Sequence, residues 1–366
     1  MKVSFFHLGA AYAYIEPYLR SLGLDVVVPP FSSRRTLDLG TRFCPEMICV
    51  PCKLIFGNYV EALEAGAEAL IMFGGPGTCR LGYSARQQEQ LLRQWGHSFT
   101  AHTFDLYHAH SELIRLTREL ADPSLPQLVE TLRFLFALIT LSDQVEQATL
   151  HLRPRERERG TATRLRSQAL SQTASLSSRQ ELEERRQAIL SPFEEAPQDK
   201  ERPVLRIGLI GDPYSISEPF FNRNLEQELG YLGVEVDRWF WISRSLKLNP
   251  LLPLLGQDHG AAVRQASQPY LAHDVGGFAR STVGQAVLFA QGGYDGLIHL
   301  APFSCTPEIV ADNLFPALKR DIHIPILSLS FDEQTSHTGL MTRLEAFVDL
   351  LWQRVRKGTR QWEDKR

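Results

Sequence analysis

The chain of 366 residues carries one plan twice, a β-rich run, a glycine, a helical pattern, a second glycine and another β-rich run. The first copy has the runs Lys2–Leu8 and Leu24–Val28, and the second has Val204–Ile210 and the segment VEVDRWFWI after Gly233. Short apolar runs that alternate with helical patterns are typical of parallel βαβ units. The sequence therefore predicts an α/β fold with two parallel-sheet modules of similar plan.

A later strand in each half ends in the pattern P-x-x-C. The predicted strand Ala69–Phe73 is followed by GGPGTC, and the predicted strand Gly296–Leu300 is followed by APFSC. This places Cys79 and Cys305 just past strand ends, where the loops of a parallel sheet form its binding crevice. Two such modules would present both cysteines at facing mouths. The similarity is weak, so a true duplication and a coincidence both stay open.

The segment between the halves, residues 111–203, differs in character. Leu125–Leu152 is apolar with helical periodicity and predicts a packed helix. The charged stretches PRERERGTATRLRSQ and ELEERRQ predict a solvated helical linker that ends at Pro192 and Pro197. Acidic and basic residues interleave there without an aromatic platform, which favours a solvated face over a nucleic-acid site. The predicted domains are 1–110 with the cysteine cluster, 111–203, and 204–366 with Cys305.

Composition restricts the partners and the compartment. The net charge of −3 gives no electrostatic case for binding nucleic acid or an anionic membrane. Glu16 and several aromatic residues interrupt the N-terminal apolar stretch, so we expect no signal peptide. The longest apolar run, near Leu132–Leu141, is about half of what a membrane span needs. We expect a cytoplasmic protein, and in that reducing compartment clustered cysteines bind metal more often than they form disulfides.

Four of the five cysteines lie in one short stretch. They are Cys44, Cys49, Cys52 and Cys79, and Cys305 stands alone far downstream. The first three follow the spacing C-x4-C-x2-C, and thiolates clustered in this way indicate a soft-metal site. We expect Pro45 and Pro51 to keep this loop out of helix. Lys53 and the helix behind it would add positive potential for thiolates. Unliganded buried thiols are the alternative.

The residues around the cysteines favour iron–sulfur over zinc. The spacing also occurs in plant-type [2Fe–2S] ferredoxins, but their loops are rich in small residues, whereas this loop carries Pro45, Glu46, Met47 and Ile48. Structural zinc normally requires two C-x2-C-like pairs or histidine partners. This stretch has one such pair and no histidine between Cys44 and Cys79. A zinc-stabilised binding module stays open as an alternative.

Three blocks of the sequence resemble a known family. They are CPEMICVPCKLIFGNYVEALEAGAEALIMFGGPGTCRLGY, GGYDGLIHLAPFSCTPEIVA and IPILSLSFDEQTSHTGLMTRLEAFVD. Together they resemble the proteins related to 2-hydroxyacyl-CoA dehydratases and their activators, labelled acyl-CoA dehydratase activase-related or CoA protein activase. The resemblance implies a cytoplasmic iron–sulfur protein of mostly anaerobic metabolism with Rossmann-like modules. It also implies that low-potential electrons arrive from an ATP-hydrolysing activator of the actin-like superfamily.

The resemblance also implies a set of cluster ligands. Its motifs match Cys44, Cys49, Cys79 and Cys305, whereas Cys52 stands where many relatives have an apolar residue and is an extra or alternative ligand. Five cysteines suffice for one [4Fe-4S] cluster. The double-cubane cluster of some relatives would use six, so here it would require a non-cysteine ligand or a second subunit, in a homo- or heterodimer.

Other residues are weaker candidates. Lys53 and Arg80 flank cysteines and are expected to bind an anionic cluster or ligand, or else to lie on the surface. His273 opens a glycine-rich segment and is a candidate cofactor-binding or substrate group. His299 is expected to be a satisfied core histidine. GGPGT at Gly74–Thr78 lacks the Lys-Ser/Thr of a P-loop, so we do not expect the chain to hydrolyse ATP.

The sequence thus predicts an iron–sulfur protein that takes electrons from an ATP-hydrolysing activator and passes them to a small substrate, such as an acyl-CoA thioester. It would act as an ATP-dependent reductase or dehydratase component, although whether it is an enzyme is left open. A non-catalytic, cluster-bearing scaffold or regulator of the activator ATPase is the alternative from another class.

Overall fold

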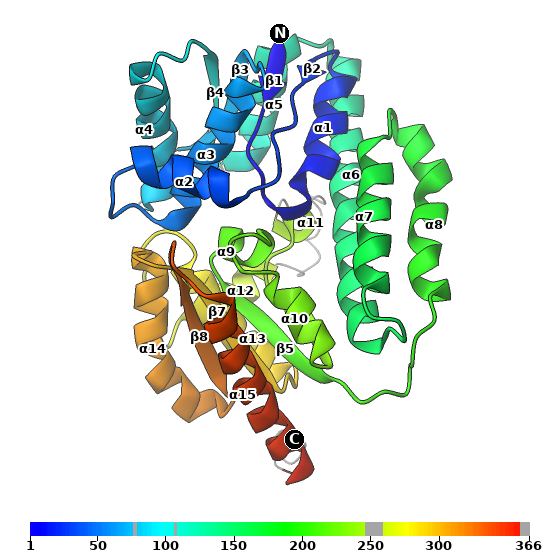
Figure 1. Ribbon diagram of the computed structural model, residues 1–366, viewed down its shortest axis with the longest axis vertical. Coiled ribbons are helices and arrows are strands. Elements are labelled where there is room, and N and C mark those ends of the chain that lie inside the picture. Colours follow the sequence, from blue (N-terminus) through cyan, green and yellow to red (C-terminus); the bar gives the residue numbers. More distant parts are fainter. Residues whose placement is uncertain (76–78, 106–107, 246–258, 359–366) are drawn as a thin grey trace. The chain divides into compact units, whose positions relative to one another are not determined.

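The structure is a computed structural model that describes residues 1–75, 79–105, 108–245 and 259–358. Across these ranges the strands form two four-stranded parallel sheets, one in each half of the chain (Figure 1). The first has the order β2-β1-β3-β4 and the second β6-β5-β7-β8, which is the same order within each half. This confirms the predicted α/β class with two Rossmann-like modules of similar plan.

The strands are short and largely buried. Those of the first sheet are β1 (Lys2–Ser4), β2 (Asp25–Val26), β3 (Ala69–Gly74) and β4 (Thr100–Asp105). Those of the second are β5 (Leu205–Gly211), β6 (Val234–Arg238), β7 (Gly296–Pro302) and β8 (Ile326–Phe331). All residues of β7 are buried. Parallel strands that are covered on both faces need continuous apolar sequence, which explains why these runs are not alternating.

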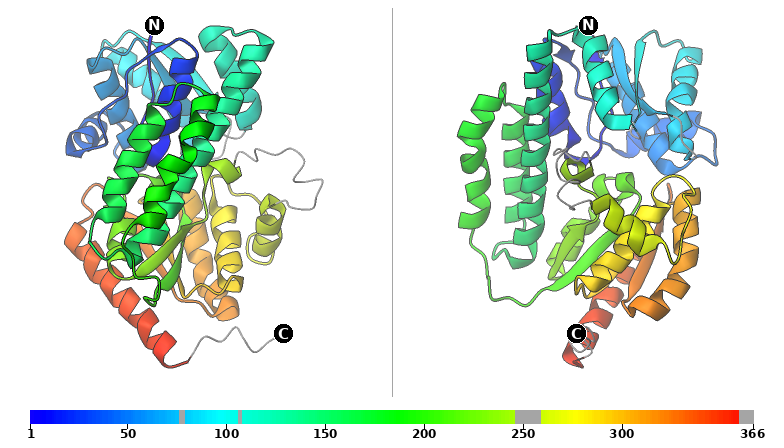
Figure 2. Two further views of the ribbon diagram at one scale, coloured as in Figure 1. Left: turned by 90° about the vertical axis from the view of Figure 1, so that its right-hand side faces the viewer. Right: turned by 180° about the vertical axis from the view of Figure 1, so that it is seen from behind.

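Helices flank both sheets (Figures 1 and 2). The first module has a short 3-10 turn at Gly9–Ala11 and α1 (Tyr12–Ser21), α2 (Arg34–Phe43), α3 (Val50–Glu64), α4 (Arg80–Gln94) and α5 (Ala109–Ala121). The second has α9 (Pro213–Ser217), α10 (Leu225–Tyr231), α12 (His259–Ser267), α13 (Ala279–Gln291), α14 (Thr306–Ile322) and α15 (His337–Arg356). The short α11 (Ile242–Ser245) lies between β6 and α12.

The middle segment is more regular than the predicted solvated linker. The predicted helix is found as α6 (Leu125–Leu152), and the 3-10 turn Arg153–Arg155 follows it. The charged stretch then forms α7 (Thr161–Ala174) and α8 (Arg179–Glu195). Their few apolar residues are buried, among them Leu170, Leu182, Ile189 and Phe193. Apolar residues spaced by whole helical turns fall on one face, so a mostly charged helix can still pack.

Two interactions join α8 to α6. Arg179 Nε donates to Glu130 Oε1 at 3.0 Å, and Arg186 donates to Gln144 Oε1 at 2.9 Å. By length and composition alone, the stretch Leu125–Arg155 would suffice to cross a membrane, a criterion that core helices of soluble proteins also meet.

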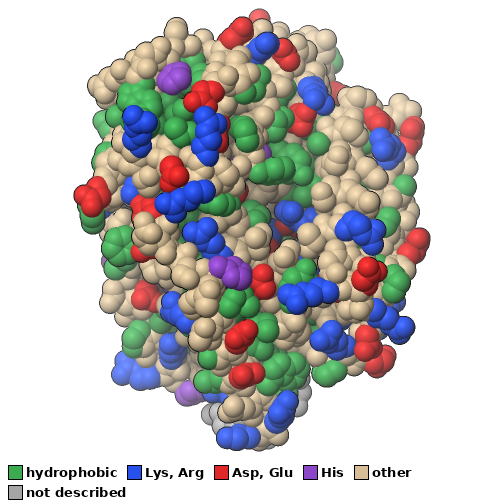
Figure 3. All heavy atoms as spheres, viewed as in Figure 1, with side chains coloured by type: hydrophobic (Ala, Val, Ile, Leu, Met, Phe, Trp, Pro, Cys, Tyr) green, Lys and Arg blue, Asp and Glu red, His purple; other side chains and the backbone are tan. Residues whose placement is uncertain are grey.

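The chain divides into two compact units. Unit 1 comprises Met1–Glu146, Ser167–Pro192 and Ile242–Leu248, and unit 2 comprises Gln147–Arg166, Phe193–Trp241 and Asn249–Arg366. The helical segment predicted for residues 111–203 is therefore shared between them. In unit 2 a hydrophobic core lies between the sheet and α13 and α14, with Val283, Phe289, Leu297 and Phe315 among its residues. Acidic and basic side chains intermingle on the face shown in Figure 3.

Candidate metal centre

The cysteines of unit 1 lie at helix ends. Cys44 is the C-cap of α2, Cys49 is the N-cap of α3, and Cys79 is the N-cap of α4. Cys52 lies in the first turn of α3, because the helix already begins at Val50. The expectation that Pro51 keeps this segment out of helix is therefore wrong. A proline in the first turn costs no hydrogen bond, since the N–H groups of that turn have no partner within the helix.

Close packing of α2 on α3 brings Cys44 to the start of α3. A Cβ on Gly40 would lie 2.1 Å from Lys53 O, and a Cβ on Gly57 would lie 2.0 Å from Thr36 O. Only glycine allows the two backbones to approach this closely. Cys44 follows Gly40 by one helical turn, and its N–H donates to Gly40 O at 2.9 Å. The contact at Gly40 therefore places the Cys44 thiol beside the other cysteines.

The four thiols of unit 1 influence one another. The Cys49 thiol donates to Cys52 Sγ at 3.6 Å. This bond, followed by burial and the charges of Cys49, Cys44 and Cys79, raises the pKa of Cys52 well above its ordinary value. Burial raises the pKa of Cys44 to about 12, although the charge of Lys53 opposes the rise. Without a cation these crowded sulfurs hold their protons, and a bound metal would favour the thiolates.

Two basic residues hold the loop between Cys44 and Cys49. Lys53 Nζ donates to Glu46 O at 2.8 Å, and the exposed Arg80 donates to Met47 O at 2.9 Å. Lys53 is only 4% exposed, so its charge lies inside the protein. The sequence predicted both residues as cofactor-binding, and the structure brings both next to cysteines. It places the third candidate, His273, exposed in unit 2 ahead of α13.

Gln88 is a site residue that the sequence did not indicate. Its Nε2 donates to Cys52 O at 2.9 Å, which ties α4 to the first turn of α3. The side chain is 1% exposed, and its Oε1 has no hydrogen-bond partner within the described part of the chain. A polar residue 36 positions away from Cys52 carries no local signal of this contact.

Helix N-termini add positive potential. Cys49 and Cys79 cap α3 and α4 without a side-chain hydrogen bond to the first turn. The first N–H groups of these helices therefore point toward the thiol region, where the partial positive charge of a helix start favours anions. Together with Lys53, these helix starts suit an anionic, thiolate-bound group.

Cys305 occupies the matching position of unit 2. It follows β7 and is the N-cap of α14, as Cys79 follows β3 and caps α4. The prediction that both cysteines stand just past strands is confirmed. That Cys305 shares a centre with the cysteines of unit 1 stays a prediction. The predicted loop Gly74–Thr78 falls partly outside the described residues, which stop at Gly75 and resume at Cys79.

Among the described residues, no group of three or more His, Cys, Asp and Glu side chains stands in position to hold one metal ion. The sulfur ligands of a single tetrahedral zinc ion would lie ~3.8 Å apart, since Zn–S bonds are about 2.3 Å long. Cluster thiolates bind different irons and stand further apart. The donor set here consists of sulfur alone, which is the chemistry of iron–sulfur ligation.

His299 of β7 belongs to a buried polar network in unit 2. Its Nε2 contacts Glu308 Oε2 at 2.9 Å, and Thr282 donates to the same carboxylate at 3.0 Å. Burial alone would lower the pKa of His299, but hydrogen bonds with Asp312 and Glu308 outweigh it and raise the pKa above 6.5. His299 is thus a satisfied core histidine, as the sequence predicted.

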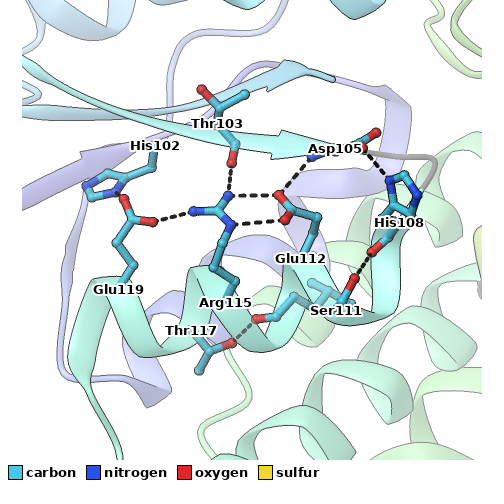
Figure 4. Close-up of polar contacts among 10 residues, drawn as sticks. His102, Thr103, Asp105, His108, Ser111, Glu112, Arg115, Thr117 and Glu119 are labelled. Carbon is cyan, nitrogen blue, oxygen red and sulfur yellow. Dashed lines mark hydrogen bonds and ion pairs between the residues drawn. The ribbon is translucent and has the colours of Figure 1, made fainter. Parts of the chain in front are cut away.

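A second polar cluster joins β4 to α5 in unit 1 (Figure 4). Arg115 binds Glu112 at 2.8 Å and also contacts Glu119 and the carbonyl of Thr103. Its hydrogen bond lowers the pKa of Glu112. In the same cluster His102 Nδ1 lies 2.6 Å from Glu119 Oε1. Most of these bonds connect the helix to the strand, so the cluster fixes α5 on the sheet.

No model of a known protein family matches the chain, and no curated protein matches it either. The functional argument therefore depends on the residues of the chain and on the resemblance of its motifs.

Proposed function

We propose that this chain is an iron–sulfur protein of the 2-hydroxyacyl-CoA dehydratase-related type, in which Cys44, Cys49 and Cys79 are cluster ligands. One observation carries the proposal. Cysteines from three helix ends lie within electrostatic reach of one another, in a donor set without histidine. A [4Fe-4S] cluster fits such thiolates, and it would supply one-electron transfer at low potential.

The residues around the thiols would perform defined tasks. The helix starts at Cys49 and Cys79 and the buried Lys53 favour thiolates over thiols, which keeps the ligands ionised. Lys53 and Arg80 hold the carbonyls of the intervening loop, so the spacing between Cys44 and Cys49 stays fixed. Gln88 fixes the first turn of α3 from the side of α4. Burial of Cys44 and Cys52 limits the access of water to the sulfurs.

The electron donor in this proposal is an ATP-hydrolysing partner of the actin-like superfamily. The acceptor is a small substrate, for which the resemblance suggests an acyl-CoA thioester. The sequence carries no P-loop signature, so the ATP-driven step is assigned to the partner.

Anaerobic purification followed by iron and acid-labile sulfide analysis tests the proposal. We expect a brown protein with about equal amounts of iron and sulfide, as cubane clusters contain. Cys44→Ala should lose the cluster, and Cys305→Ala should lose it if Cys305 is the fourth ligand. Cys52→Ala should keep it and serves as the matched control, since Cys52 lies in the same turn. A colourless, iron-free protein, or stoichiometric zinc, would refute the proposal.

Activity measurements separate the two roles of such a protein. With the purified activator, ATP and a reductant, an electron carrier reduces its substrate. A scaffold would bind the activator and turn over nothing.

A further inference from the structure

Cys49 and Cys52 form the sequence C-V-P-C at the start of a helix. Cys49 caps α3, and Cys52 N–H donates to Cys49 O at 3.0 Å, which closes the first turn. The two sulfurs already lie 3.6 Å apart. Cys49 is partly exposed, whereas Cys52 is fully buried.

We infer that Cys49 and Cys52 are a redox-active dithiol, which exchanges with small disulfides when no metal occupies Cys49. A C-x-x-C pair in an α/β protein is a known arrangement for thiol–disulfide exchange, in which the helix start activates the first thiol. The sulfurs need to approach from 3.6 Å to about 2.05 Å. Side-chain rotation provides this movement while Pro51 keeps the backbone of the turn rigid.

The positions of the two cysteines set the order of the reaction. The Cys49 thiolate attacks one sulfur of an external disulfide such as oxidised glutathione, and one small thiolate leaves. Cys52 then loses its proton to solvent and attacks Cys49 Sγ, which forms the internal disulfide and expels the second small thiolate. Both leaving groups take up a proton. Two protein thiols are oxidised and one small disulfide is reduced, so two electrons are exchanged.

This inference gives Cys52 a role that the proposed ligand set does not. If the proposed function holds, the internal disulfide and a Cys49-bound cluster exclude each other, because a disulfide sulfur has no thiolate to offer. That consequence rests on the proposed function, whereas the exchange reaction itself does not.

Redox titration of the full-length chain tests the inference. The chain, with its iron content measured, is equilibrated anaerobically in buffers of varied reduced and oxidised glutathione, alkylated and mapped by peptide mass spectrometry. We expect one two-electron transition that yields a Cys49–Cys52 linkage. Cys52→Ser should instead accumulate glutathione on Cys49, and Cys49→Ser should leave the buried Cys52 reduced.

Cys79 supplies the matched control within the same chain. It also caps a helix and is partly exposed, but Gly82 stands three residues later where α3 has Cys52. Cys79 should therefore stop at the mixed disulfide, and Cys79→Ser should leave the Cys49–Cys52 transition unchanged. A mixed disulfide that persists on wild-type Cys49, or linkage of Cys49 to Cys44 or Cys79, would overturn the inference. Circular dichroism checks folding, and Cys52→Ala replaces Cys52→Ser if the serine variant unfolds.

The outcomes separate the two proposals. An iron-free protein that forms the Cys49–Cys52 disulfide would defeat only the proposed function. An iron–sulfur protein whose metal-free form lacks this disulfide would defeat only the dithiol.

Discussion

At the scale of single residues, buried polar side chains have the largest effect on the thiol region. Gln88 reaches from α4 to a backbone carbonyl of α3, that of Cys52. A buried hydrogen bond of this kind contributes about 1 kcal/mol, and its loss leaves a carbonyl with one partner fewer. Gln88 therefore joins two helices whose first turns both carry cysteines.

Gln88→Met removes the donor and keeps the length of the side chain. We expect a loss of about 1 kcal/mol in the free energy of unfolding and faster alkylation of Cys52, because the first turn of α3 loosens. Denaturant titration and thiol labelling measure both effects. Gln90→Met, at an exposed position of the same helix, is the control. Equal labelling rates in the two variants would contradict the positioning role of Gln88.

The buried pair of His299 and Glu308 predicts a pH dependence of stability. The pKa of His299 is raised in the folded protein, so the stabilisation is complete below the unfolded value of 6.5 and is lost as the pH rises through the higher folded value. We expect the free energy of unfolding to fall between about pH 6 and 9 and to fall less in His299→Gln. His323→Asn, at the exposed end of α14, should keep the wild-type profile. An unchanged slope in His299→Gln would contradict the assignment.

At the scale of elements, the crossing of α2 and α3 determines where Cys44 lies. Two glycines allow this crossing, Gly40 near the cysteines and Gly57 near the other end of the contact. Thr36 adds a hydrogen bond of 2.7 Å to the buried carboxylate of Glu61. The helix pair thus works as a rigid support for the thiol region.

Gly40→Ala would insert a methyl group against the backbone of Lys53. We expect a loss of about 1–3 kcal/mol in stability, as for other overpacked sites, and a loss of bound iron, because Cys44 is displaced. Gly57→Ala is the matched control, since it should destabilise by a similar amount with less effect on iron content. Denaturant titration and metal analysis at a temperature where both variants are folded separate the two effects. Iron content that falls equally in both would show that only stability matters.

At the scale of the whole molecule, the two modules repeat one topology and place a cysteine at the same point of each. Cys79 follows the third strand of its module and Cys305 follows the third strand of the other, and each caps the next helix. Hydrogen exchange can report separately on each unit. It therefore tests the ligand prediction for Cys305 within unit 2 itself, whatever the arrangement of the two units.

Cluster binding should slow hydrogen exchange at the start of α3 and at the start of α4, because ligand binding stabilises the elements that hold the ligand. If Cys305 is a ligand, the start of α14 should be protected as well. Mass spectrometry of the iron-loaded and iron-free chain measures this, and Cys305→Ala is the control for α14. Protection confined to unit 1 would contradict a ligand role for Cys305.

Local patterns of the sequence were enough to predict the sheets and the site's main residues. Apolar runs bounded by glycine indicated parallel strands, and their positions placed Cys79 and Cys305 past strand ends, as the structure confirms. Two local expectations were wrong for identifiable reasons. Pro51 starts a helix because first-turn N–H groups need no partner, and the charged linker packs because its few apolar residues share helix faces.

The sequence by itself determined the order of elements, the parallel class of the sheets and the crowding of four thiols in one stretch, because these depend on neighbours along the chain. Tertiary structure alone decided that Gly40 meets Lys53, that Gln88 reaches Cys52 and that Glu308 pairs with His299. Such contacts arise when helices pack on one another and on strands. The geometry of packing depends on the shapes of many side chains at once, and no local pattern of residues contains it.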